Sequence, residues 1–257
     1  MFDIADLPLW GAGLLLVILP TALSALGPVI VRRAFGFERI KPNNEVAGFK
    51  FAVLGVIYAV ILAFTVIVVW ERFADAEHAA SKEAAAVATL YRLSDGIPQA
   101  PRADLRAKLD DYLKAAVSQE WKTMERGDES PAAQAALTTL YGSVLAIQPQ
   151  DNADTVLLKS MFDELTLLTQ ARRERIVLAN GIVPALLWAV LIVGAIITVG
   201  FTLFFGSQNL SAQVVMTAML ALLIFMTMFV VFAIDYPFGR HIRVQPDSLV
   251  RVMNDFD

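Results

Sequence analysis

Residues 48–70 read GFKFAVLGVIYAVILAFTVIVVW, and the 20 residues after Lys50 carry no charge. As a helix these 20 residues rise about 30 Å, which matches the hydrocarbon core of one bilayer. Residues 71–90 then contain eight alanines and no glycine or proline, so we expect the helix to continue into water. Its end is predicted at Ser94-Asp95-Gly96, where Gly96 can adopt the left-handed conformation of a C-cap. One membrane span is therefore expected to run directly into a soluble helix.

Small residues recur at steps of three and four along this span, which places them on one face of the helix. In lipid such a face allows another backbone to approach closely, or it leaves space along an axis shared by several copies. The sequence supports both interpretations equally, and the residues concerned are Gly48, Ala52, Gly55, Ala59 and Ala63.

The composition indicates a membrane protein and removes several functional classes. Of 257 residues, 57% are hydrophobic and 18% are charged, a balance that is rare in soluble domains. The net charge of −4 argues against a nucleic-acid partner. The chain has no cysteine and two histidines, His78 and His241, so the usual metal ligands and nucleophiles are scarce. We therefore expect no enzyme activity, no cofactor and no metal site.

Four apolar runs predict the domain organisation. We expect an all-α integral membrane protein with four transmembrane helices and an extramembrane helical bundle between spans 2 and 3. The second and third spans are expected to continue into the bundle as long helices. The spans are predicted near residues 9–31, 51–70, 182–205 and 210–234. The corresponding domains are a transmembrane hairpin (1–70), a helical soluble domain (71–177), a second hairpin (178–239) and a C-terminal tail (240–257).

Basic residues flank the spans on both sides, so charge does not decide the orientation. The short first loop carries five basic residues, which favours placing that loop in the cytoplasm. Eight basic residues near the spans on the other side favour the opposite orientation, namely Arg72, Lys82, Arg172, Arg173, Arg175, Arg240, Arg243 and Arg251.

Several segments resemble a known family. Pro237-Phe238-Gly239 after the fourth span and Val53-Leu54-Gly55 in the second are similar to triplets of bestrophin channels. LGVIYAVILAF (54–64), EAAAVATLYRL (83–93), DYPFG (235–239) and VQPDSL (244–249) resemble the bacterial bestrophin-like family, catalogued as a domain of unknown function. This second resemblance covers nearly the whole chain.

The resemblance implies a homo-oligomer, a pentamer in bestrophins, with the second span of each copy around a central anion-conducting axis. It places the constriction at Gly48, Ala52 and Val56, where bestrophins carry bulky apolar rings. Because the first two are small here, a gate at Ile57, Leu62 or Phe64 is the alternative. The acidic run that binds calcium in animal bestrophins is replaced by Arg240-His241-Ile242-Arg243, so no calcium site is expected there. The family also implies a multi-pass protein of the bacterial inner membrane with a cytoplasmic soluble domain.

Individual polar residues of the spans have structural as well as functional interpretations. Lys50 begins the second span and can form an anion-attracting ring in an oligomer, although a lysine at a helix end commonly extends to the lipid headgroups. Tyr58 and Thr65 within that span fit structural hydrogen bonding. Asp235 closes the fourth span, and we expect it to anchor the turn onto a basic partner such as Arg32 or Arg240.

Glu71, Asp75, His78 and Lys82 share a helix face beyond the second span. A metal site would need ligands from a second helix, and the sequence contains no second Glu-x-x-His pair. A solvated face with charge pairs is therefore expected.

Two functional hypotheses follow. The first is passive ion conduction, with anions favoured because Lys50 and the adjoining arginines make the field positive. The alternative is a non-conducting membrane scaffold or sensor whose soluble domain binds a protein partner. The expected partners are the lipid bilayer, further copies of the chain and inorganic anions.

Overall fold

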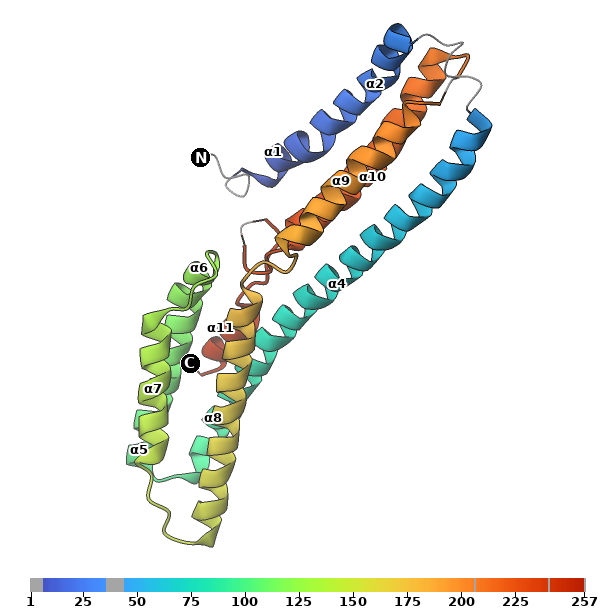
Figure 1. The fold of residues 1–257 in the computed structure, drawn as a ribbon. Helices are drawn as coiled ribbons and strands as arrows, with labels where there is room; N and C mark the ends of the chain where they lie inside the picture. The colour runs from blue at the N-terminus through green and yellow to red at the C-terminus, as the bar shows by residue number, and fades with distance from the viewer. Residues whose placement is uncertain (1–6, 36–43, 206, 240, 257) are drawn as a thin grey trace. The chain divides into compact units, whose positions relative to one another are not determined.

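The structure is a computed structural model that describes residues 7–35, 44–205, 207–239 and 241–256. Every regular element within these residues is helical. In chain order the elements are α1 (Leu9–Gly13), η2 (Leu14–Ile18), α2 (Leu19–Phe35), α4 (Asn44–Leu93), η4 (Ser94–Gly96), α5 (Gln99–Ala115), η5 (Ala116–Glu120), α6 (Trp121–Met124), α7 (Pro131–Leu145), α8 (Asn152–Leu178), α9 (Ala185–Thr202), α10 (Leu210–Ile234) and α11 (Asp247–Asp255) (Figure 1).

Four helical segments are long and apolar enough to cross a membrane: Leu9–Phe35, Asn44–Gly96, Ala185–Thr202 and Leu210–Ile234. The predicted fold class is thereby confirmed. The chain forms two compact units. One, here called the membrane unit, comprises Met1–Glu71 and Val183–Asp235. The other, the bundle unit, comprises Arg72–Ile182 and Tyr236–Asp257.

In the membrane unit, α2 packs along α10, and α9 contacts both of these helices. Two glycines mark close approaches: a Cβ added at Gly27 of α2 would lie 2.6 Å from Leu203, and one at Gly194 of α9 would lie 2.5 Å from the ring of Tyr58. The first span tolerates Pro28 inside α2 and contains the π-helical segment η2. The small core includes Tyr58, Leu62, Leu191, Ala195, Val199, Ala221 and Ile224.

Helix α4 is continuous over 50 residues, as the alanine-rich sequence predicted. It ends at Leu93, and the predicted stop Ser94–Gly96 forms one turn of 3-10 helix. The expectation that Gly96 adopts a left-handed conformation is wrong. Among the described residues only Gly127 has a positive φ, of 79°. The 3-10 turn makes the left-handed cap unnecessary, because Ile97 donates its backbone N–H to the Ser94 carbonyl.

The third span does not continue from the bundle as a single helix, which corrects the sequence prediction. Helix α8 ends at Leu178, and α9 begins at Ala185 after an irregular connection. Pro184 explains the break, because its ring disfavours helical conformation at the preceding residue and it has no N–H to donate. A side chain satisfies one backbone donor of this connection: the Asp235 carboxylate accepts a 2.8 Å hydrogen bond from the Val183 N–H.

The bundle unit is built from α5, α7 and α8 together with the extramembrane part of α4. Helices α7 and α8 start at the side-chain caps Ser130 and Asp151, which accept hydrogen bonds from Ala133 and Asp154. The residues after the fourth span are part of the same unit, because α11 packs on α5 and its Leu249 is fully buried. Phe256 stacks on the Tyr91 ring at a centroid distance of 3.8 Å.

Candidate pore helix and surrounding polar sites

The small-residue face of α4 is uncovered in the protomer. Ala52, Ala59 and Ala63 are exposed, and Gly48 and Gly55 are half-buried. A Cβ added at Gly55 would meet no described atom within 4 Å, and one at Gly48 would meet only the Phe205 ring at 3.9 Å. Within the part of the chain that the structure describes, no other helix therefore fills this face.

A different face of α4 attaches the helix to α9 and α10. Its buried residues are Tyr58, Leu62, Thr65 and Val69. The Tyr58 hydroxyl donates a 3.0 Å hydrogen bond to the Leu191 carbonyl, and its ring lies over Gly194. Thr65 donates to the Ile61 carbonyl, which is the structural role expected for it.

Helical geometry separates the predicted pore residues into groups. Successive residues are rotated by about 100°, so Gly48, Ala52, Gly55, Ala59 and Ala63 share one face, with Val56 at its edge. Lys50 is two residues from both Gly48 and Ala52, which places it on roughly the opposite side. Ile57 and Phe64 are exposed on that far side as well. Leu62 belongs to the packed core, so the three alternative gate residues do not share a face.

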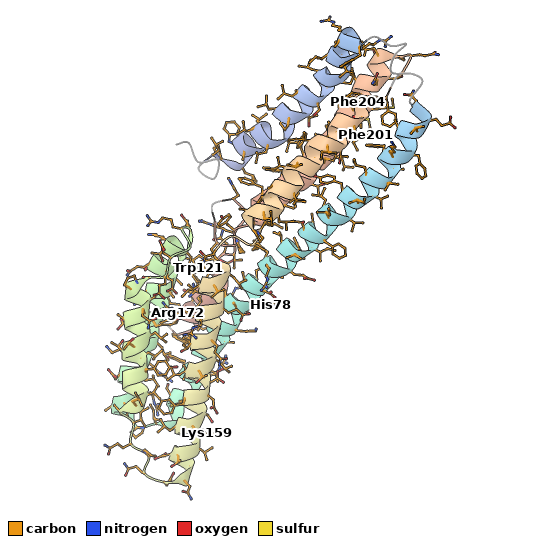
Figure 2. The ribbon with its side chains drawn as sticks, viewed as in Figure 1. His78, Trp121, Lys159, Arg172, Phe201 and Phe204 are labelled. Atoms are coloured by element: carbon orange, nitrogen blue, oxygen red, sulfur yellow. The ribbon has the colours of Figure 1, made fainter. Side chains whose placement is uncertain are left out.

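The start of α4 is fixed by three aromatic rings. Phe51 of α4 contacts Phe201 at a centroid distance of 5.9 Å and Phe205 at 5.6 Å. Figure 2 labels Phe201, on α9, and its neighbour Phe204. These contacts hold the end of α4 that carries Lys50, whose own side chain is exposed.

Asp235 anchors the connection between the helices, although its described contacts are not the basic partners named from the sequence. The carboxylate is buried and accepts hydrogen bonds from the Val183 N–H and from the Trp188 indole N–H at 3.1 Å. The Arg32 guanidinium donates to the Ser207 and Gln208 carbonyls. Arg240 lies outside the described residues, so its pairing with Asp235 and the absence of a calcium site at residues 240–243 stay predictions.

The motif Pro237-Phe238-Gly239 holds the C-terminal segment in the bundle unit. Phe238 is buried and contacts the Trp121 ring edge-on at 5.7 Å. The Pro237 carbonyl accepts a 2.7 Å hydrogen bond from Val244, whose own carbonyl accepts one from the Trp121 indole. The motif is thus a packing element in this chain.

A buried ion-pair network lies inside the bundle unit and was not predicted. Arg175 of α8 bridges Glu83 of α4, at 2.6 Å, and Glu120 of η5, at 2.7 Å. Arg172, labelled in Figure 2 between the bundle helices, pairs with Glu120 at 2.6 Å. The Tyr112 hydroxyl donates a 2.7 Å hydrogen bond to Glu83. Two carboxylates and two guanidinium groups balance, so the network buries no net charge.

The ionisation of this network follows from its partners. Burial alone would raise the pKa of the Glu120 carboxyl, but the Arg172 hydrogen bonds and the Arg175 charge outweigh it and lower that pKa. Burial alone would lower the pKa of Arg175, and the Glu83 carboxylate reverses the direction. The Tyr112 pKa is raised by burial and by the neighbouring Glu83 carboxylate. The Glu120 carboxylate and the Arg175 guanidinium are therefore held in their ionised forms.

The helical periodicity contained a signal for this network. Glu83 falls in register with Ala76, Ala80 and Val87, which are all buried. Arg172 and Arg175 fall in register with Leu165 and Leu168 of α8. Counting both arginines as charges at the membrane surface was wrong, because Arg175 is fully buried and Arg172 is 5% exposed. Without these two arginines, six of the eight basic residues counted near the spans on the side of the soluble domain remain.

The outer face of α4 in the bundle unit carries surface charge pairs. Arg72 lies 3.9 Å from Asp75, and Lys82 lies 3.7 Å from Glu174. His78, labelled in Figure 2, is exposed on this helix. The described residues contain no group of three metal-ligating side chains. The charge pairs fit the solvated face that the sequence favoured.

Comparison with solved structures identifies the fold. A variant of a bacterial bestrophin homologue from Klebsiella pneumoniae aligns with a TM-score of 0.71 and 16% identity, covering 93% of this chain and 97% of that chain. A second variant gives a TM-score of 0.72 and 15% identity over 93% and 98% of the two chains. A further structure of the homologue gives 0.69 and 15% over 93% and 96%. At such identities the likeness shows the fold alone.

The comparison with curated proteins gives no match. The profile of the bestrophin-like domain, in contrast, matches residues 18–249, which is most of the chain. This match confirms the resemblance drawn from the four sequence segments. The chain therefore belongs to the bestrophin-like family and is a membrane protein of the bestrophin type.

Proposed function

We propose that this protein is an oligomeric ion channel in which α4 of each copy lines a central pathway. The observation that carries the proposal is the uncovered face of α4, where small residues lie free while Tyr58 and Leu62 attach another face to α9 and α10. A helix held firmly on one side and bare on another is suited to surround a shared axis. Membership of the bestrophin-like family supports a homo-oligomer, with five copies as the expected number.

Within this pathway Val56 is the best candidate for the constriction. It is 64% exposed, and it is the only one of the three positions implied by the resemblance with a side chain larger than methyl. Gly48 and Ala52, the other two, leave open space. Ile57 and Phe64 point away from the small-residue face, which favours contact with lipid or with neighbouring helices for them.

Anions are the favoured ions in this proposal. Arg32, Arg33 and Lys50 lie near the end of the membrane unit where α2 finishes and α4 begins (Figure 1). Because Lys50 lies roughly opposite the small-residue face, these groups would act through the field at the mouth and not as a ring in the pathway. The family resemblance supports a bacterial inner-membrane location with the bundle unit in the cytoplasm.

Single-channel recording in planar bilayers tests the proposal. The purified protein should produce unitary currents above those of protein-free bilayers. Single cysteines at Ala52, Val56, Ala59 and Ala63 test the pathway, because the native chain contains none. A charged, membrane-impermeant thiol reagent should reduce the current through these variants. Cysteines at Ile57 and Phe64 are matched controls on the same helix and should leave it unchanged. Absence of current under several ionic conditions would refute conduction.

The second candidate is a non-conducting scaffold or sensor. Exposed apolar side chains on α8 favour it, since Val156, Leu167 and Val177 are each more than half exposed. Such residues are suited to contact a protein partner. This function predicts no current and no labelling of cysteines at Ala59 or Ala63 from water, because a neighbouring helix would then fill the small-residue face.

A further inference from the structure

Helix α4 keeps one rotational register from the membrane unit into the bundle unit. Its buried residues in the span are Tyr58, Leu62, Thr65 and Val69, and the same steps of three, four and seven continue through Ala76, Ala80, Glu83 and Val87, which are buried too. Since the helix is continuous over this length, the buried side gives an internal reference for the direction of every other side chain.

By that reference the direction of the small-residue face can be followed beyond the span. Its extension contains Ala74, Ser81 and Ala88, which are not fully buried, together with the exposed Trp70 and the buried Ala84. One ionisable residue stands in the middle of this extension. Glu77 follows Ala59 by 18 residues, which is five turns of helix, so both side chains leave α4 in nearly the same direction.

Glu77 carries an uncompensated charge. Its side chain is exposed, and no described residue forms an ion pair or hydrogen bond with it. The charges around it are occupied elsewhere: Arg72 with Asp75, and Lys82 with Glu174. Glu71 is also exposed, but it is six residues away and therefore rotated by about 120° from Glu77.

We propose that Glu77 forms a ring of carboxylates at the bundle-side mouth of the pathway, where it attracts cations and repels anions. The inference rests on the proposed function, because copies of α4 around one axis would bring one Glu77 each to that axis. A ring of like charges at a pore mouth sets the local ion concentration. Glu77 would thus oppose the positive field of Arg32, Arg33 and Lys50 at the other mouth.

Reversal potentials measured in a KCl gradient test this assignment. Replacing Glu77 by glutamine should raise the ratio of chloride to potassium permeability at least about twofold, whichever ion the native channel prefers. Glu77→Lys should raise it further. Both effects should shrink at high salt, because mobile ions screen an exposed charge. Glu71→Gln is the matched control, removing the same charge from the same helix on another side, and should leave the ratio unchanged.

The possible outcomes separate this inference from the proposed function. Currents whose permeability ratio is the same in native protein, Glu77→Gln and Glu77→Lys would overturn the role of Glu77 and leave conduction intact. An equal shift in Glu71→Gln would also overturn it, because a general surface charge would then explain the effect. Absence of current from the native protein would overturn the proposed function and this inference together.

Discussion

Arg175 is the residue on which the interior of the bundle unit most depends. Its guanidinium donates to Glu83 and Glu120, lies 4.4 Å from the Trp121 ring centroid, and is fully buried. Replacing Arg175 by alanine leaves two carboxylates short of a partner in a dry site, which costs about 3–5 kcal/mol. We expect the melting temperature of the purified protein in detergent to fall by about 10 °C.

Lys159 provides the control for this substitution. It pairs with Asp163 at 2.9 Å on the outside of α8, and its side chain is 76% exposed. Water and mobile ions screen this pair, so Lys159→Ala should leave the melting temperature unchanged. Equal stability of Arg175→Ala and the native protein would show that the buried network does not hold the bundle together.

The pKa of the Glu120 carboxyl predicts how the stability of the folded protein depends on pH. The lowered pKa of its carboxyl in the folded protein means that the network contributes stability above the unfolded value of 4.5. This contribution is lost as the pH falls through the lower folded-state pKa, because protonation removes the charge that Arg172 and Arg175 require.

Melting temperatures of the native protein should therefore decline below about pH 4.5. Glu120→Gln should start from a lower melting temperature and show a smaller decline over the same range. A decline of the same size in both proteins would assign the acid sensitivity to other carboxylates.

At the level of elements, the attachment of α4 to α9 depends on a glycine. A Cβ at Gly194 would lie 2.5 Å from the Tyr58 ring, so Gly194→Ala forces the two helices apart. We expect Gly194→Ala to lower the melting temperature and to change the thiol accessibility of cysteines at Ala59 and Ile57, because α4 can no longer keep its register.

Two further variants are controls against which the effect of Gly194→Ala on stability can be compared. Gly200→Ala in the same helix meets no described atom within 4 Å and should be neutral or slightly stabilising. Tyr58→Phe keeps the ring and removes the hydrogen bond to Leu191, which should cost only about 0.6 kcal/mol in a membrane. A neutral Gly194→Ala would contradict the steric role given to this glycine.

Local chemistry explains which elements the sequence could predict. Helix α4 was predictable because its apolar run favours a helix in the lipid bilayer and its alanine-rich part favours a helix in water. Neither part contains a residue that would interrupt the helix. The break between α8 and α9 was missed, although Asn180, Gly181 and Pro184, three residues that disfavour a helix interior, lie between the two helices. Asp235, which is distant in sequence, stabilises the irregular connection by accepting a hydrogen bond from the Val183 N–H.

The buried network shows a second limit of sequence reasoning. Helical periodicity places Glu83, Arg172 and Arg175 on inward faces, but a charge at such a position is buried only when a partner of opposite charge meets it. That partner comes from another helix, and its identity depends on tertiary packing. The small-residue face of α4 was predictable from spacing alone, whereas its exposure in the protomer required the positions of α9 and α10.

At the scale of the whole molecule, the membrane unit presents two kinds of uncovered surface. Large apolar side chains such as Ile57 and Phe64 suit contact with lipid tails. The small residues of α4 do not fill space against lipid, and close approach of another backbone is what such a face permits. The proposed assembly around a shared axis follows from this difference between two sides of one helix.

The same new side chain on these two sides tests the assembly. Ala59→Phe places a ring on the small-residue face, where copies of α4 would surround a narrow pathway, so it should abolish the unitary current or reduce the number of subunits. Ile57→Phe adds a ring two residues away, rotated by about 160°, where lipid can accommodate it. It should keep the native subunit number in native mass spectrometry and the native current. A single protomer as the native species, or equal effects of both substitutions, would contradict a pathway formed by several copies of α4.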